Sequence, residues 1–198
     1  MKISAIKPAV KTQGRYNIFV DGKYSFSLDE QQLLDMGLKI KLEIDERRLI
    51  ELKAESDFGK KYARAFELIL RRSRSVKEIR DYAWRKKWEP EETERIITKL
   101  TSKKYLDDAT FAASWVRTRA ILKHVSKRKL TLELRQKGVA SDIIEQAIAS
   151  SEDYDERTAL QELVDKKRAR YADEQKFMAY LLRQGFGYEA VKQVVKGD

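Results

Sequence analysis

Short runs of β-branched and aromatic residues, separated by turn signals, mark the beginning of the chain. The runs Ile3–Val10, Tyr16–Val20 and Tyr24–Leu28 predict three strands. Asp21-Gly22 lies between the last two runs and predicts a β-hairpin, because both central residues of a type I′ turn need positive φ.

Helix signals follow these strands. Ser27-Leu28-Asp29-Glu30 reads as a capping box, in which the Ser27 hydroxyl accepts a backbone N–H and Glu30 reaches back to Ser27. A short helix over 31–36 is predicted, ended by Gly37. We expect a strand over 38–42 and helix again from Asp45. Residues 1–55 are therefore predicted to form a small α+β module.

Beyond residue 55 the apolar positions follow the period of helices alone. Ser75, Ser141 and Asp173 precede helical windows and are predicted N-caps. Pro90 suits the first turn of a helix, where its missing N–H would have no partner anyway.

This helical part repeats itself. Three blocks align without gaps when Ile79, Leu130 and Phe177 are superimposed, at spacings of 51 and 47 residues. Every other aligned core position is also apolar, except Thr93. These positions are Ala83, Leu134 and Leu181; Trp88, Val139 and Phe186; Thr93, Ile144 and Val191; and Ile96-Ile97, Ala147-Ile148 and Val194-Val195.

The alignment predicts one helix, then a bend whose interior is filled by the third aligned residue, and then a second helix. Gly138 and Gly185 stand just before this residue, and Lys87 takes their place in the first block. An upstream helix over 62–70, 111–122 or 158–169 completes each unit. We therefore predict a mainly α-helical protein with three-helix repeats over 56–106, 107–150 and 151–198. One unit buries too little surface alone, so stacked units should form an elongated, curved rod.

The charge is concentrated in the middle of the chain. The net charge is +10, and charged residues make up 37% of the sequence, well above the usual fraction of about 25%. Residues 56–106 hold 15 basic and 8 acidic residues, whereas residues 151–198 hold 9 and 10. A basic excess of this kind favours an anionic partner such as nucleic acid over a merely solvated surface.

Several classes of protein and site are disfavoured. The sequence has no cysteine, which excludes disulfides. No signal peptide and no membrane-spanning stretch is visible, so a cytoplasmic protein without membrane contact is expected.

No Gly-rich nucleotide loop occurs, and we expect no enzyme activity, cofactor or metal. His124, the single histidine, stands among cations and is expected to be a solvated surface residue. Asp107 and Asp108 are better explained as helix caps than as metal ligands.

Basic residues are the strongest candidates for a binding site, because clustered lysines and arginines contact phosphates without needing a particular sequence. Trp88 and Trp115 are expected to pack in the core, and Trp84, one position off the core, to be more exposed. The predicted contact residues are Arg71, Arg72, Arg74, Lys86, Lys87, Arg117, Arg119, Lys123, Lys127, Arg128, Lys129, Arg135 and Lys137.

Four segments together resemble the RecX family of recombinase regulators. They are RYNIFVDGKYSFSLDE, RRSRSVKEIRDYAWRKKW, ITKLTSKKYLDDATFAASWVRTR and LELRQKGVASDIIEQAI, and the likeness covers nearly the whole chain. The order of KYLDD and ELRQKG is the most specific part. The residues that carry the signature are Tyr105, Leu106, Asp107, Asp108, Glu133, Leu134 and Gly138.

The sequence departs from the family pattern at two places. His124-Val125-Ser126 stands where the family usually has a glycine before the second helix of the second repeat, and Lys87-Trp88 replaces a Lys-Gly-aromatic bend.

The resemblance implies a monomeric regulator that binds the RecA recombinase and its filaments on DNA. It implies inhibition of recombinase, ATPase and co-protease activity in DNA repair, recombination and the SOS response, with single- and double-stranded DNA as further partners. Two alternatives stay open: a sequence-nonspecific DNA-binding protein of tandem helical units without RecA, and a solenoid that binds only an acidic protein.

Overall fold

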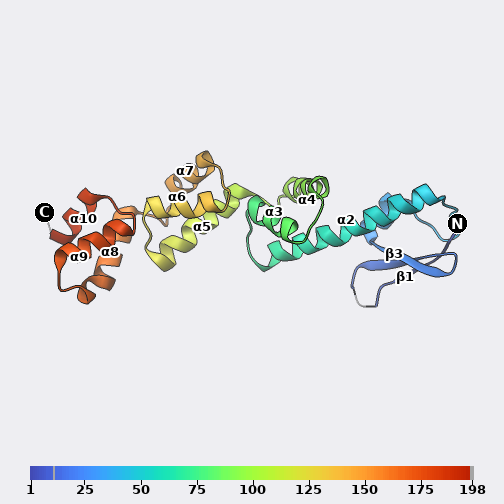
Figure 1. Ribbon diagram of the computed structural model, residues 1–198, viewed down its shortest axis with the longest axis horizontal. Helices are drawn as coiled ribbons and strands as arrows, with labels where there is room; N and C mark the ends of the chain where they lie inside the picture. The colour runs from blue at the N-terminus through green and yellow to red at the C-terminus, as the bar shows by residue number, and fades with distance from the viewer. Residues whose placement is uncertain (11, 197–198) are drawn as a thin grey trace. The chain divides into compact units, whose positions relative to one another are not determined.

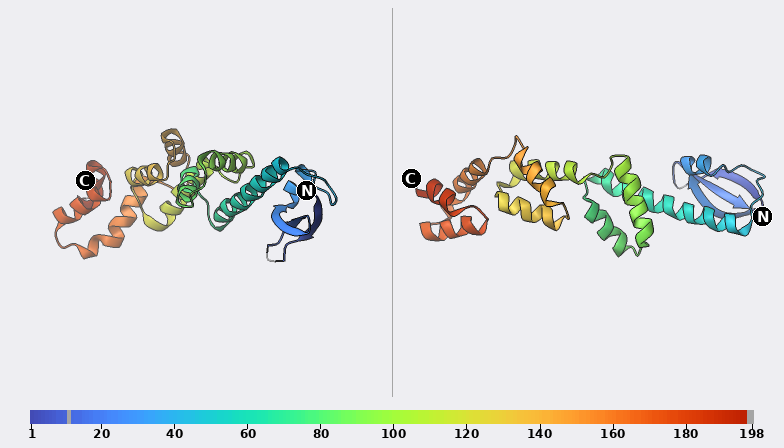
Figure 2. Two further views of the ribbon diagram at one scale, coloured as in Figure 1. Left: turned by 45° about the vertical axis from the view of Figure 1, so that its right-hand side comes forward. Right: turned by 90° about the horizontal axis from the view of Figure 1, so that it is seen from above.

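The computed structural model describes residues 1–10 and 12–196, and it is mainly helical with an N-terminal three-stranded sheet (Figures 1 and 2). The fold class predicted from the sequence is confirmed in this respect. The chain divides into two compact units. Unit one comprises residues 1–71 and 89–100, and unit two comprises residues 72–88 and 101 onward.

Unit one is built on an antiparallel sheet. Its strands are β1 (Ile3–Pro8), β2 (Arg15–Val20) and β3 (Lys23–Asp29), paired in the order β1-β2-β3. Asp21 and Gly22 have φ of 47° and 82°, which confirms the predicted hairpin turn. One core joins the sheet to the following helices; its buried side chains are Ile3, Ile18, Val20, Phe26, Leu28, Leu38, Ile44 and Leu52.

Two local predictions for this unit are wrong. Helix α1 (Glu30–Asp35) is capped by Asp29 with Gln32 as its reciprocal partner, so the capping box lies two residues beyond Ser27. Ser27 instead belongs to β3, where its carbonyl accepts a hydrogen bond from Ser56. Segment 38–42 is not a strand, because Lys41 has φ of 73° and turns the chain.

Helix α2 (Glu46–Arg71) is continuous over 26 residues and crosses the predicted boundary at residue 55. The sheet lies beside the first part of this helix (Figure 1), where the buried Ser56 hydroxyl donates to the Ser27 carbonyl at 2.6 Å. Helix α4 (Pro90–Ser102) packs on α2 through Arg95, which pairs with Glu55 at 2.7 Å and stacks on Phe58 at 3.8 Å. The repeat limits stay a prediction.

Unit two holds the remaining helices. They are α3 (Val76–Arg85), α5 (Asp108–Lys123), α6 (Lys127–Gln136), α7 (Ser141–Ala149), α8 (Glu156–Lys167), α9 (Glu174–Arg183) and α10 (Tyr188–Lys196), with a short 3₁₀ turn, η1, at Arg168–Arg170. Helices α5–α7 enclose one apolar core and α8–α10 a second.

The aligned positions of the second and third blocks belong to these two cores or pack against them. Across all three blocks the aligned positions are buried except Trp88, Val194 and Val195, which are partly buried. The N-cap predictions hold at Ser75 and Asp173. The prediction at Ser141 is wrong, because Ala140 takes the cap position without a side-chain hydrogen bond.

The three bends share one backbone conformation. Lys87, Gly138 and Gly185 all have positive φ, at 56°, 79° and 94°. In each bend the following residue is the apolar one that fills the bend, and its N–H donates to the carbonyl five residues earlier, as in a Schellman motif. A Cβ on Gly138 would come 2.6 Å from the Cβ of Lys77, so glycine is also needed there for close approach.

Successive repeats are joined by a buried serine. Ser75, the N-cap of α3, accepts the Glu78 N–H and donates its hydroxyl proton to the Lys137 carbonyl at 2.7 Å. Ser126, the N-cap of α6, accepts the Lys129 N–H and donates to the Gln184 carbonyl at 2.8 Å. Each serine therefore links the start of the second helix of one repeat to the end of the second helix of the following repeat.

A carboxylate reinforces each of these junctions. The first backbone N–H of α3, at Val76, donates to Asp108 at 2.8 Å, and that of α6, at Lys127, donates to Glu156 at 2.8 Å. Asp108 and Glu156 are the first residues of α5 and α8. Helix N-termini have unpaired N–H groups and a positive dipole end, so both contacts are favourable. In the third repeat, Asp173 caps α9 through the Lys176 N–H.

Replacing Ser126 with alanine tests the serine junction. The change removes a helix cap, which costs about 1 kcal/mol, and leaves the Gln184 carbonyl unpaired, at about 1–3 kcal/mol. We expect urea unfolding to show a loss of about 2–3 kcal/mol in the free energy of unfolding. The matched control is Ser150→Ala, because Ser150 is exposed and bonds only within its own helix end. Equal small losses in both variants would contradict the role of the junction.

Candidate nucleic-acid interface

Each junction borders a groove on the surface of unit two. The first junction groove has a volume of about 530 Å³ and is lined by Arg72, Arg74, Lys77, Glu78, Asp81, Trp84, Arg85, Gln136 and Lys137. The second junction groove has a volume of about 570 Å³ and is lined by Lys127, Arg128, Thr131, Leu132, Arg135, Glu156, Gly185 and Gly187.

The two grooves are equivalent by the internal repeat. At the spacing of 51 residues, Lys77 corresponds to Arg128, and Trp84 corresponds to Arg135. In both grooves, basic side chains of a second helix face the bend of the following repeat. The fold therefore places two basic grooves one repeat apart.

Some of the predicted contact residues are held inside the first junction groove by Glu78. The Glu78 carboxylate, only 12% exposed, accepts two hydrogen bonds from Arg72 and one from Lys137 at 2.6 Å, with Arg74 at 4.0 Å. Burial alone would raise the pKa of Glu78, but the hydrogen bonds and charges of Arg72 and Lys137 lower it to about 2. These cations therefore stabilise the groove itself.

Other predicted contact residues also take part in packing. Arg119 donates to Glu133 at 2.7 Å and stacks on Trp115, whose indole N–H donates to the same carboxylate at 2.9 Å. Arg117 is exposed and forms a surface ion pair with Asp153 at 3.2 Å. Lys129 is half-buried and donates to the Gln184 side chain at 3.1 Å, so it supports the second junction.

The remaining predicted contact residues are exposed. Within residues 1–10 and 12–196 they form no ion pair, and they are Arg71, Lys86, Lys87, Lys123, Lys127, Arg128 and Arg135. Lys127, Arg128 and Arg135 lie together in the second junction groove. Lys86 lies near the ring of Tyr82, at 5.9 Å from its centroid.

Two basic residues of the first junction groove, Lys77 and Arg85, were not predicted from the sequence. The repeat alignment held the signal for Lys77, because its counterpart Arg128 is among the predicted residues. Arg85 corresponds to Gln136, so the alignment offered no hint for it.

The family signature residues have structural roles. Leu106 and Leu134 are buried, and Gly138 forms the second bend. Asp107 caps α5, and the N–H groups of Ala109 and Thr110 lower its pKa. Asp108 caps α3 across the junction, and burial raises its pKa. The prediction that both aspartates are helix caps is confirmed.

The prediction of a solvated His124 is wrong. Its side chain is 19% exposed, and its Nδ1 lies 2.6 Å from a Glu162 carboxylate oxygen. His124 ends α5 with φ of 47°, a conformation that glycine adopts at less cost. Because of this positive φ, a glycine would fit the position with less backbone strain than the histidine.

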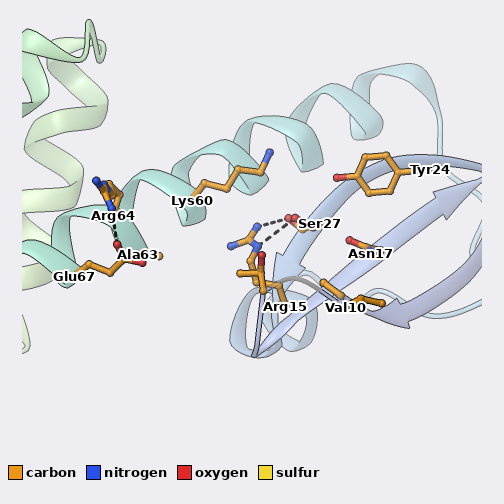
Figure 3. Close-up of a pocket in the computed structure, with 11 residues that line it drawn as sticks. Val10, Arg15, Asn17, Tyr24, Ser27, Lys60, Ala63, Arg64 and Glu67 are labelled. Carbon is orange, nitrogen blue, oxygen red and sulfur yellow. Dashed lines mark hydrogen bonds and ion pairs between the residues drawn. The ribbon is translucent and has the colours of Figure 1, made fainter.

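A cavity in unit one is a weaker candidate. It has a volume of about 580 Å³ and lies between the sheet and α2 (Figure 3). Two of its charged side chains already have partners, because Arg15 donates to the Ser27 hydroxyl at 3.2 Å and Arg64 pairs with Glu67 at 2.8 Å. Burial lowers the pKa of Arg15.

No three histidine or acidic side chains in the described part of the chain are placed to hold a metal ion. No helix there is both long and apolar enough to cross a bilayer.

Comparisons with known proteins agree on one family. The models of the RecX N-terminal domain and of the second three-helix domain of RecX match residues 1–45 and 107–148. The chain is 32% identical to regulatory protein RecX of Bacillus subtilis (strain 168), over 96% of this chain and 74% of that protein. It is 31% identical to regulatory protein RecX of Listeria welshimeri, over 97% and 74%.

Two solved structures are also similar. A crystal structure of regulatory protein RecX matches with a TM-score of 0.81 and 29% identity, over 100% of this chain and 99% of that one. That of RecX from Lactobacillus salivarius matches with a TM-score of 0.63 and 25% identity, over 71% and 96%.

The Glu78 cluster predicts a specific dependence of stability on pH. The folded pKa of about 2 lies below the ordinary value of 4.5, so the stabilisation is complete above about pH 4.5 and is lost as the pH falls toward 2. It amounts to at most about 3 kcal/mol. Glu78→Gln should therefore be less stable than the parent at pH 7, and urea unfolding should show the gap narrowing at pH 3.

The same substitution at the exposed Glu91 is the control. A gap between Glu78→Gln and the parent that stays constant from pH 7 to pH 3 would contradict the assignment.

Proposed function

Because the chain belongs to the RecX family of regulatory proteins, we propose that it binds the RecA recombinase and RecA–DNA filaments. It modulates, and mainly inhibits, the recombinase, ATPase and co-protease activities of RecA. It acts as a cytoplasmic monomer in DNA repair, recombination and the SOS response. The supporting observation from the fold is the second junction groove, where Lys127, Arg128 and Arg135 are exposed and form no ion pair with any residue that the structure describes.

The state of each cation decides how much it contributes to binding. A cation already paired with a buried carboxylate, such as Lys137 with Glu78, loses that partner when it turns to a phosphate. An exposed arginine such as Arg128 has no such loss and releases counterions from the DNA on contact. The proposed contact with filament DNA is therefore centred on Arg128 and Arg135 rather than on the whole set of predicted residues.

The mode of action is binding rather than chemistry. RecX is not a known family of enzymes. A protein that occupies a filament and contacts both its DNA and its protein surface can block turnover and strand exchange without a reaction of its own. Single- and double-stranded DNA are both proposed partners, because phosphate contacts are common to them.

The alternative is a sequence-nonspecific DNA-binding protein of tandem helical units without a RecA partner. The observation in its favour is that both junction grooves are basic, since phosphates alone would explain this property.

RecA assays separate these two functions. We expect the protein to lower the rate of ATP hydrolysis by RecA on single-stranded DNA at a concentration too low to coat the DNA itself. We also expect it to co-sediment with RecA filaments more strongly than with the same DNA alone. Equal co-sedimentation with both, together with unchanged ATP hydrolysis, would favour the alternative.

Charge reversal tests the position of the contact. Arg128→Glu with Arg135→Glu should weaken binding to DNA and to the filament together. The slope of log affinity against log salt should flatten by roughly one unit for each phosphate that the variant no longer binds. Folding should be retained, because exposed charges contribute little to stability.

The matched control for this double variant is Lys176→Glu with Lys196→Glu. It makes the same change in charge at two exposed positions of the third repeat, outside both grooves. Equal weakening by both double variants would mean that the groove does not locate the contact.

A further inference from the structure

Trp84 is the most exposed of the chain's three tryptophans. Its side chain is 81% exposed, on a helix whose buried face carries Ile79 and Ala83. Trp88 packs edge-on against Tyr82 at 5.6 Å, and Trp115 bonds to Glu133. Trp84 has no comparable partner among the residues that the structure describes. Its packing gives no reason for a large aromatic ring at this position.

The surroundings of Trp84 are strongly basic. Lys77, Asp81, Trp84 and Arg85 recur at the spacing of one helix face and line the first junction groove. The groove contains five basic and two acidic side chains. One of the acidic groups, Glu78, is turned inward and bound by Arg72 and Lys137. The other, Asp81, is neutralised by Lys77 at 2.6 Å.

We infer that the first junction groove binds single-stranded nucleic acid, with one unpaired base stacked on the Trp84 indole and the adjoining phosphates held by Arg85 and Lys77, the exposed cations of the groove that are not bound to Glu78. This inference rests on the proposed function, in that it assumes nucleic-acid binding, and adds a base-stacking site to it. An exposed aromatic ring beside phosphate-binding cations is the combination by which proteins hold single strands without reading their sequence.

The second junction groove lacks this feature. Arg135 occupies the position that corresponds to Trp84 in the first groove. The large apolar side chain that lines the second groove is Leu132, which is 56% exposed. The second groove can therefore contact phosphates but offers no aromatic platform. In a duplex the bases are already paired and stacked, so the platform serves only unpaired strands.

Binding measurements on the full chain test the inference. The probe is a labelled oligo(dT) of about 15 nucleotides, compared with a duplex of the same length by fluorescence anisotropy. Trp84→Ala should weaken oligo(dT) binding by about fivefold or more and duplex binding by less than about twofold. Trp84→Phe, which keeps an aromatic face, should restore most of the affinity. Leu132→Ala is the matched control, because it truncates an exposed apolar side chain in the second groove, and it should have no effect.

Intrinsic fluorescence gives a second measurement. Oligo(dT) should quench the tryptophan emission of the parent protein and have much less effect on Trp84→Phe, because Trp88 and Trp115 are packed. Equal loss of single-strand and duplex affinity in Trp84→Ala, or no loss at all, would overturn the inference. The inference would also be overturned if polyglutamate displaced oligo(dT) from the parent protein but not from Trp84→Ala. That result would point to an acidic protein segment as the occupant of the groove. If the protein still lowers ATP hydrolysis by RecA, and Arg128→Glu with Arg135→Glu still weakens binding to the filament, the proposed function survives this failure.

Discussion

One buried hydroxyl at each repeat junction sets the geometry of unit two. Ser75 and Ser126 each accept an N–H from their own helix and donate a proton to the last turn of a helix in the next repeat. Serine is small enough for full burial and is both donor and acceptor, which alanine and aspartate are not. This hydrogen bond determines which two helix ends lie against each other at the junction. The grooves at the two junctions are alike because the same contact makes both of them.

This geometry divides the basic residues into two groups. Those that point into a junction, such as Lys137 and Lys129, hydrogen-bond to side chains across it and contribute to folding. Those on the outer face of a second helix, such as Arg128 and Arg135, have no ion pair in the described chain and are available to a partner. A net charge counts both groups equally, so it overstates the part of the surface that can bind phosphates.

Much of the fold could be predicted from the sequence because it depends on periodicity. The repeat alignment identified the positions that form the cores, and the hairpin followed from Asp21-Gly22. Competition between neighbouring groups was not predictable in this way. Ser27 and Asp29 can both cap a helix. Because Ser27 is part of strand β3, Asp29 caps the helix instead. Likewise, nothing local distinguishes Lys129 from Arg128, because the partner of Lys129 lies 55 residues away.

Asp173 occupies the place in the third repeat that Ser75 and Ser126 hold in the first two. A carboxylate can cap its own helix, but when ionised it has no proton to offer. A helix end from another molecule, with its row of outward carbonyl oxygens, would meet like charge here instead of a donor. The serine contact that joins successive repeats therefore has no counterpart at the start of α9, where Asp173 only caps its own helix. This single change of residue type confines the contact to the two junctions of the described chain.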